Sequence, residues 1–244
     1  MNTNETEGRH GMRDNIIVAL DQPDLASALA CAELLVGRAS WVKVGMTLFY
    51  REGPAAVSAL REMGFNVFCD LKMYDIPHQV EGAARSLGAL GAGMLTVHAS
   101  GGAPMMEAAV RGAAEGAAAA GVHAPAVIAI TVLTSMDADT LNSVGVNDGP
   151  ADQAIGLAAL AKTAGVAGVV CSPQEAADLR ALLGPHALIV TPGVRPAGAD
   201  AGDQSRIATP AAAFKAGASH IVIGRPVTGA ADPAAAFDAI VADL

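Results

Sequence analysis

Short apolar runs alternate along this chain with longer, Ala-rich segments that are typical of helices. Apolar runs of this length, bounded by turn residues, indicate buried strands. Eight of them occur, at residues 16–20, 41–44, 66–71, 94–98, 126–131, 168–171, 188–191 and 220–223. The segments between and after them predict helices over residues 24–37, 51–63, 78–91, 103–120, 151–165, 173–184, 209–217 and 232–243. Strands that alternate with helices indicate parallel βαβ units.

Residues that begin and end helices support this alternation. Proline opens several predicted helices, as at Pro54, Pro104 and Pro233, because its fixed backbone angle suits the first helical turn. Glycine ends others, as at Gly64 and Gly121. Eight βα units predict a closed (β/α)8 barrel, the TIM-barrel fold, as a single α/β domain.

The barrel domain is predicted to cover residues 15–244, after a disordered N-terminal tail over residues 1–14. The first 13 residues are polar and lack the apolar centre of a signal peptide. No uninterrupted apolar run reaches the roughly 20 residues that a membrane helix needs. The three cysteines are far apart and form no CxxC pair, which is typical of reduced packing residues. We therefore expect a soluble, cytoplasmic protein without a membrane segment.

Charge restricts the classes of partner. The net charge of −9 disfavours a nucleic-acid surface, because binding phosphate backbones needs clustered Lys and Arg. A small anionic ligand remains compatible with it, since a few local cations can outweigh a diffuse negative field. The histidines are scattered along the sequence, so no metal site is predicted from them.

Four charged residues stand at the ends of the first three predicted strands: Asp21, Lys43, Asp70 and Lys72. Strand side chains alternate between faces, so Asp70 and Lys72 share a face and are about 7 Å apart along the strand. Burying such a pair costs several kcal/mol per ion unless other charges and hydrogen bonds compensate. Barrel enzymes bind substrate at the C-terminal ends of the strands, where these charges lie.

Two interpretations of these charges are open. One is a structural ion-pair network at the rim of the barrel. The other is an alternating catalytic array, Lys43–Asp70–Lys72, which Asp75 could extend. A lysine held protonated among carboxylates can stabilise a developing carbanion and then deliver a proton. It is less suited to Schiff-base chemistry, which needs a neutral amine.

The last two strands predict a phosphate site. Strand seven runs into Gly193 and Arg195, and strand eight ends in Gly224 and Arg225. Barrels often bind phosphate with these loops, because backbone N–H groups and cations converge there. The stretch over residues 193–207 is long for a barrel loop and could form a lid.

Other polar residues are weaker candidates. Thr134 and Ser135, after strand five, could hydrogen-bond a polar ring or cap their own loop. His98, at the end of strand four, could be a ligand or base, but a hydrogen-bonded structural role is favoured.

With these residues placed, the chain resembles the orotidine 5′-monophosphate decarboxylase family over about residues 15–243. The resemblance rests on motifs at the ends of seven strands: Val-Ala-Leu-Asp21, Lys43-Val-Gly, Asp70-Leu-Lys-Met-Tyr-Asp-Ile-Pro77, Val97-His-Ala-Ser-Gly-Gly102, Thr131-Val-Leu-Thr-Ser-Met136, Thr191-Pro-Gly-Val-Arg-Pro196 with Gly202-Asp-Gln204, and Ile223-Gly-Arg-Pro226.

The resemblance implies a role for each matching residue near the reacting ring. Lys72 would donate a proton to C6 of the pyrimidine after CO2 leaves, and Asp70 would lie near the substrate carboxylate. Lys43 and Asp21 would contact the ribose hydroxyls. Asp75 would reach into the site of a neighbouring subunit, which implies a homodimer with shared active sites. No cofactor is implied.

The remaining substrate-binding residues follow from the same resemblance. Thr134, with Ser135, would meet the pyrimidine, and the phosphate side and lid would be held by Arg195, Gln204, Gly224 and Arg225. Ile76 and Gln79 follow Asp75 in its substrate-binding segment. The family often has Thr at the position of Gln79, so this residue departs from the family pattern.

Two alternatives remain open. A related barrel of the hexulose-phosphate synthase or keto-gulonate-phosphate decarboxylase type shares the Asp-x-Lys-x-x-Asp pattern but uses a divalent metal. Ile76-Pro77, Thr134-Ser135 and Gln204 distinguish the present chain from that type. The second alternative is a catalytically silent nucleotide-binding barrel, against which the intact set Lys43, Asp70, Lys72 and Asp75 argues.

Overall fold

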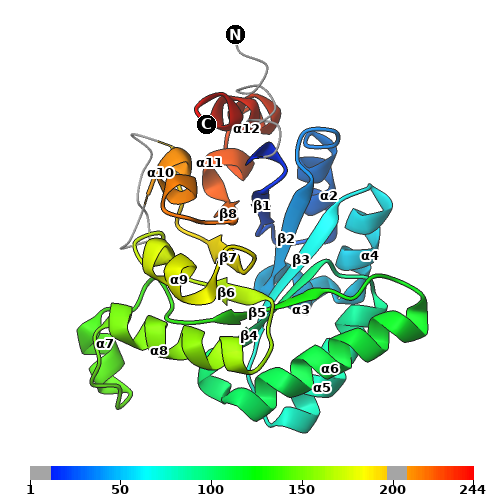
Figure 1. Ribbon diagram of the computed structural model, residues 1–244. Helices are drawn as coiled ribbons and strands as arrows, with labels where there is room; N and C mark the ends of the chain where they lie inside the picture. Colours follow the sequence, from blue (N-terminus) through cyan, green and yellow to red (C-terminus); the bar gives the residue numbers. More distant parts are fainter. Residues whose placement is uncertain (1–11, 197–207) are drawn as a thin grey trace.

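The computed structural model describes residues 12–196 and 208–244, in which eight parallel strands close into a barrel (Figure 1). Each strand pairs in parallel with the next, and β8 returns to β1. The strands are β1 (Ile16–Leu20), β2 (Trp41–Gly45), β3 (Asn66–Met73), β4 (Met94–His98), β5 (Ala126–Ile130), β6 (Gly168–Val170), β7 (Leu188–Thr191) and β8 (His220–Ile223). The predicted single-domain (β/α)8 barrel is confirmed.

Helices form the outer layer around these strands (Figure 1). They are α2 (Leu25–Glu33), α3 (Met46–Glu52), α4 (Pro54–Glu62), α5 (Pro77–Ala89), α6 (Ala103–Ala120), α7 (Ala138–Ser143), α8 (Pro150–Thr163), α9 (Ala176–Leu183), α10 (Pro210–Lys215), α11 (Arg225–Thr228) and α12 (Pro233–Ala242), with a 3-10 turn η1 at Ala99–Gly101. None of the helices in the described ranges is long and apolar enough to cross a membrane.

The structure differs from the sequence-based expectation mainly in short helices. The single helix expected over residues 51–63 is two helices, α3 and α4, because Gly53 between them has a φ of 62° that interrupts the helical backbone. The short helices α3, α7 and α11 follow strands β2, β5 and β8 in segments for which no separate helix was predicted. β3 continues two residues further than its apolar run, to Met73.

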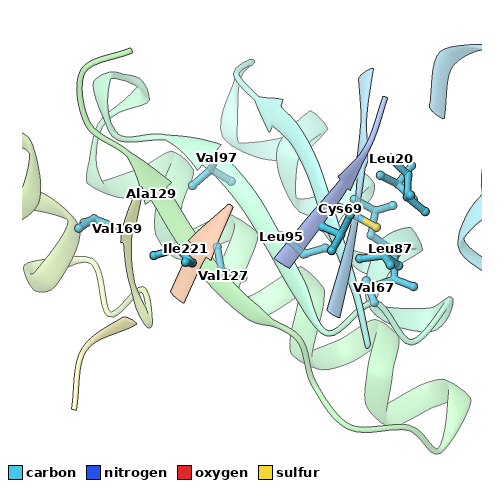
Figure 2. Close-up of a cluster of buried hydrophobic side chains, with 14 of the residues drawn as sticks. Leu20, Val67, Cys69, Leu87, Leu95, Val97, Val127, Ala129, Val169 and Ile221 are labelled. Atoms are coloured by element: carbon cyan, nitrogen blue, oxygen red, sulfur yellow. The ribbon is translucent and has the colours of Figure 1, made fainter. Parts of the chain in front are cut away.

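Two hydrophobic layers account for the alternation along the strands. Inward-facing residues fill the barrel: Ile17, Ala19, Phe68, Met94, Ile128, Val190 and Val222. Outward-facing residues pack against the helices, and Figure 2 shows part of this layer, including Cys69 of β3, Leu95 of β4 and Leu87 of α5. Phe68 and Cys69 therefore face opposite sides, as the period of two predicts.

Of the tail expected over residues 1–14, residues 1–11 lie outside the described part of the chain. Arg13 donates hydrogen bonds from Nε to the carbonyl of Arg38 (2.7 Å) and from a terminal nitrogen to that of Gly37 (2.8 Å). Asp14 accepts a hydrogen bond of 2.6 Å from the Ser40 hydroxyl. These contacts lie at the N-terminal end of the barrel, away from the ends of the strands that carry the charged residues.

Helices α5 and α6 pack closely through glycine. A methyl group at Gly112 of α6 would overlap the carbonyl oxygen of Glu81 in α5, and one at Gly116 would overlap that of Arg85. In the other direction, a methyl group at Gly88 of α5 would overlap the carbonyl oxygen of Ala113. The two helices can approach this closely only because these positions lack a side chain. The close contact thus holds α5, which connects β3 to β4, against α6.

We predict that Gly112→Ala lowers the free energy of unfolding by about 1–3 kcal/mol, because the helices must separate to admit the methyl group. The matched control is Gly156→Ala in α8, where nothing lies within 4 Å of the added atom. That change should leave stability unchanged or raise it by up to about 1 kcal/mol, since Ala favours the helix. Denaturant unfolding at one protein concentration measures both; equal effects at the two positions would contradict the close-packing account.

Candidate active site

A cavity of about 570 Å³ opens at the C-terminal ends of the strands. Its lining comes from strand ends and loops on both sides of the barrel, including those after β5, β7 and β8. Ten of the residues predicted from sequence line it: Asp21, Lys43, Asp70, Lys72, Thr134, Ser135, Gly193, Arg195, Gly224 and Arg225. The structure therefore gathers residues more than 200 positions apart in sequence, such as Asp21 and Arg225, around one cavity.

An alternating chain of charges runs along the β1–β3 side of this cavity. Lys43 Nζ is 3.0 Å from Asp21 Oδ1 and 3.7 Å from Asp70 Oδ2. Lys72 Nζ is 2.8 Å from the same oxygen of Asp70. The Asp70 side chain is 13% exposed and that of Lys43 10%, so the centre of the array is largely removed from water. The predicted Lys43–Asp70–Lys72 array thus forms within one chain, and Asp21 extends it.

Asp70 is the electrostatic centre of the array. Burial alone raises the pKa of its carboxyl, but the nearby charges of Lys43 and Lys72 and the hydrogen bonds from Lys72 and Thr96 outweigh burial and hold the pKa below its ordinary value. The carboxylate therefore stays ionised at neutral pH. A buried carboxylate held in this way fixes the position of each ammonium group that contacts it.

Thr96 is a polar residue at this site that the sequence-based reasoning missed. It lies on β4, is fully buried, and its hydroxyl donates to Asp70 Oδ1 at 3.1 Å. The Thr96 hydroxyl oxygen also accepts the backbone N–H of Lys72 at 2.8 Å. A signal was available, because Thr96 lies midway between Met94 and His98 and so shares the inward face with Met94. Because Thr is common in strands, its presence in β4 does not by itself indicate a role at the site.

The backbone at Lys72 has an unusual conformation. Its φ is 50°, and no other non-glycine residue in the described ranges has a positive φ. The β3–β4 pairing is irregular here, since its register shifts between Cys69 and Met73. Left-handed backbone at a non-glycine residue costs about 1–3 kcal/mol and persists only where the surroundings hold it. The irregularity leaves the Lys72 side chain on the same side as Asp70, in contact with it.

Gly45 provides the space for the array. A Cβ atom at this position would lie 2.9 Å from both Asp21 Oδ1 and Lys43 Nζ. Gly45 is also the partner of Asp70 in the β2–β3 register. Any side chain here would push apart the ion pair that links β1 to β2. The glycine that ends the Lys43-Val-Gly motif is therefore explained by close approach of these two charged groups.

Arg195 and Arg225 line the opposite side of the cavity, at the ends of β7 and β8. Arg195 is 9% exposed, and its buried Nε has no hydrogen-bond partner among the described residues. Its backbone is anchored, because its N–H donates to the carbonyl of Ala208 at 3.0 Å. A buried guanidinium with an unused donor is suited to an anion such as a phosphate oxygen. Gly193, in the preceding turn, has a φ of 76°.

Several predicted residues are not placed in this cavity. Gln204, and most of the lid expected over residues 193–207, lie outside the described residues. Asp75, Ile76 and Gln79 are described, but they are exposed and do not line the cavity of their own chain. The Asp75 carboxylate accepts the backbone N–H of Ile76 at 2.7 Å. Asp75 therefore does not extend the array within one chain.

His98 lies beside the array rather than in the cavity lining. Its ring packs against that of Tyr74 with centroids 5.7 Å apart. Burial lowers the pKa of His98, and the charge of Lys72 lowers it further while Asp70 opposes the change. The sequence favoured a hydrogen-bonded structural role for His98, whereas the contact that the structure shows for its ring is packing against Tyr74. Among the residues that the structure describes, no three His, Cys, Asp or Glu side chains gather as a metal-ion site.

Residues 14–240 match the Orotidine 5′-phosphate decarboxylase / HUMPS family. The orotidine 5′-phosphate decarboxylase of Anaeromyxobacter sp. (strain K) is 53% identical over 231 residues, which cover 95% of this chain and 98% of that protein. The enzyme of the same name from Moorella thermoacetica is 51% identical over 233 residues, covering 95% of this chain and 92% of the relative.

A solved structure is similar over nearly the same length. The crystal structure of orotidine 5′-phosphate decarboxylase from Lactobacillus acidophilus has a TM-score of 0.83 at 40% identity, covering 93% of this chain and 97% of that one. The family match spans most of the sequence, and the relatives correspond over nearly their full length. The chain belongs to the Orotidine 5′-phosphate decarboxylase / HUMPS family.

Proposed function

We propose that this protein decarboxylates orotidine 5′-monophosphate to UMP, the last step of pyrimidine nucleotide synthesis. The observation that carries the proposal is the Asp70–Lys72 pair, 2.8 Å apart in the cavity and backed by Lys43. This arrangement offers a positioned ammonium group to a developing carbanion, which is what loss of CO2 from the pyrimidine requires. The names of the relatives support the same reaction.

In the proposed reaction Lys72 is the proton donor. The bond between C6 and the carboxyl carbon breaks, CO2 leaves, and the electron pair stays on C6. Lys72 Nζ donates a proton to C6 and regains one from solvent. Asp70 holds Nζ at hydrogen-bond distance, while Lys43 and Asp21 bind the ribose hydroxyls. The ammonium stabilises the carbanion electrostatically in a partly buried pocket, so the proposal requires no cofactor.

The far side of the cavity provides remote binding energy. Arg195, Gly224 and Arg225 would bind the phosphate, and Thr134 with Ser135 would meet the pyrimidine. Binding energy from a non-reacting group can be used to hold the ring in its reactive position. In this proposal Gln204 and the lid over residues 193–207 complete the phosphate site.

The proposal includes a homodimer with shared sites. Asp75, Ile76 and Gln79 would contact the substrate of the partner subunit, with Gln79 in place of the Thr that the family often has. The support is their position, since they are exposed and do not line the cavity of their own chain. Tyr74 and Ile76 in the same segment are 63% and 62% exposed, and large apolar side chains of this kind are typical of interfaces.

A cytoplasmic location is part of the same proposal. Its support is that Cys31, Cys69 and Cys171, which all lie in the described ranges, are not joined in disulfides. Disulfides are typical of oxidising compartments and rare in the cytosol.

The alternative is a metal-dependent sugar-phosphate aldolase or decarboxylase of the hexulose-phosphate synthase or keto-gulonate-phosphate decarboxylase type. It is considered because both types of enzyme have the Asp-x-Lys-x-x-Asp pattern, so the pattern does not distinguish them. Thr134 and Ser135 at the cavity favour the nucleotide substrate, since they offer hydrogen bonds to a pyrimidine edge.

The experiment that tests the proposed function follows the absorbance of orotidine 5′-monophosphate with purified protein. We expect the absorbance to fall at the same rate with and without excess EDTA, because no step uses a metal ion. A reaction that stops in EDTA would favour the metal-dependent alternative. UMP binding without any turnover would favour the silent nucleotide-binding barrel.

We predict that Lys72→Ala lowers kcat by about 10³-fold or more, because the proton donor and its charge are both removed. UMP affinity should stay within an order of magnitude, since the phosphate side is intact. The matched control is Lys215→Ala, an exposed lysine at the end of α10, which should keep the wild-type rate. A near-normal rate for Lys72→Ala would show that another group donates the proton.

Shared sites predict complementation between two inactive variants. Asp75→Asn and Lys72→Ala homodimers should each be nearly inactive, whereas a mixed dimer contains one site with both native residues. Verified heterodimers should therefore have about half of the wild-type rate per dimer, and a 1:1 statistical mixture, about half of which is heterodimer, about a quarter. Each homodimer taken alone through the same mixing procedure is the control. Verified heterodimers with no recovered activity would rule out this sharing of Asp75.

A further inference from the structure

We infer that Thr96 is a positioning residue for the reaction, whose hydroxyl fixes the Asp70 carboxylate and the Lys72 backbone in one arrangement. The inference rests on the proposed function, since it concerns how the proton donor is held. Thr96 does not line the cavity, so it acts through its two neighbours rather than on substrate.

Both hydrogen bonds of the Thr96 hydroxyl go to the segment that carries the chemistry. A hydroxyl has one proton to donate and can also accept. Oγ1 of Thr96 donates to Asp70 Oδ1 at 3.1 Å and accepts the Lys72 N–H at 2.8 Å. Thr96 is fully buried, so water does not compete for either bond. One side chain on β4 thus joins two residues of β3.

The irregular end of β3 explains why the Lys72 N–H bonds to a side chain. β3 and β4 pair regularly at Phe68 with Met94 and at Cys69 with Leu95, but the next pair is Met73 with Val97. Four steps along β3 therefore match two steps along β4, so extra residues of β3 bulge out of the ladder. Lys72 lies in this bulge with a φ of 50°. The Thr96 hydroxyl takes the N–H that a regular ladder would pair with a carbonyl.

The same hydroxyl determines how the Asp70 carboxylate is oriented. Oδ2 of Asp70 forms ion pairs with both ammonium groups, at 2.8 Å from Lys72 Nζ and 3.7 Å from Lys43 Nζ. Oδ1 is held by Thr96. With a partner on each oxygen, the carboxylate plane cannot rotate without breaking a buried hydrogen bond. Thr96 thereby fixes the position of the oxygen that holds Lys72 Nζ.

A purely structural role for Thr96 makes a different prediction. If the hydroxyl served only to pair buried polar groups, its loss would lower stability, and ligand binding and turnover would change in parallel or not at all. If it positions the proton donor, its loss lowers kcat while the binding of UMP, which lacks the reacting carboxylate, changes little. The split between kcat and UMP affinity therefore separates the two roles.

The experiment compares Thr96→Ser with Thr96→Ala, which differ by one oxygen atom. We expect Thr96→Ala to lower kcat by about 10- to 100-fold relative to Thr96→Ser, in line with the loss of a positioning contact. Thr96→Ser should remain within about threefold of wild type, and the Kd of UMP should change less than about threefold in both variants. Activity is measured per folded protein, with the thermal midpoint of each variant recorded.

A matched control is Thr131→Ala, which also removes a buried hydroxyl. Thr131 donates to the carbonyl of Val170 at 2.9 Å and has no hydrogen bond to the charged array. It should keep kcat within about threefold of wild type. If Thr96→Ala does not fold, Thr96→Val, which keeps the volume and removes the oxygen, replaces it in the comparison with Thr96→Ser.

The outcomes distinguish the inference from the function on which it rests. Equal kcat values for the Ser and oxygen-less variants, with an active wild type, overturn the positioning role and leave the proposed function standing. A parallel fall of kcat and UMP affinity also overturns it, in favour of a structural role. A wild-type protein that does not decarboxylate orotidine 5′-monophosphate overturns the proposed function, and the inference with it.

Discussion

The largely buried carboxylate of Asp70 is the group on which the site depends. A charge in this position is tolerable only if its partners stay in place, because removing one leaves an uncompensated ion in a low-dielectric surrounding. Lys43, Lys72 and Thr96 supply those partners from three consecutive strands, and Asp21 from a fourth holds Lys43 in turn. The order β1-β2-β3 in the barrel is therefore also the order in which the charges meet, and β4 adds the hydroxyl of Thr96.

Much of this arrangement follows from strand periodicity. The alternation of inward and outward residues predicts the barrel, and because strand ends share one rim, it also brings Asp21, Lys43 and Asp70 together. The confirmed strands β1, β4, β7 and β8 have the predicted bounds because each is an apolar run with clear turn residues on both sides. Fold and charge array are thus both consequences of one repeating pattern.

What the sequence could not give are features that depend on tertiary contact. The bulge at Lys72 needs a hydroxyl from β4, and no local pattern in Asp70-Leu-Lys-Met announces it. In the sequence Thr96 is an ordinary strand residue, because its contacts with Asp70 and Lys72 depend on the pairing of β3 with β4. Asp75 lies beyond the end of β3, at Met73, where strand alternation no longer predicts the direction of a side chain. Spacing alone does not fix that boundary.

The two sides of the cavity differ in charge, and this asymmetry bears on how binding and chemistry are divided. Among the described lining residues, the β1–β3 side has two carboxylates and two ammonium groups, whereas the β7–β8 side has the guanidinium groups of Arg195 and Arg225. Under the proposed function, a phosphate would meet a net positive charge of the lining side chains on the β7–β8 side only, which would orient an asymmetric substrate despite a net charge of −9. The balanced array can then be kept rigid, because it contributes position rather than net attraction. On this view the buried hydrogen bonds of Asp70 mainly fix the position of the charged groups and contribute less to substrate affinity.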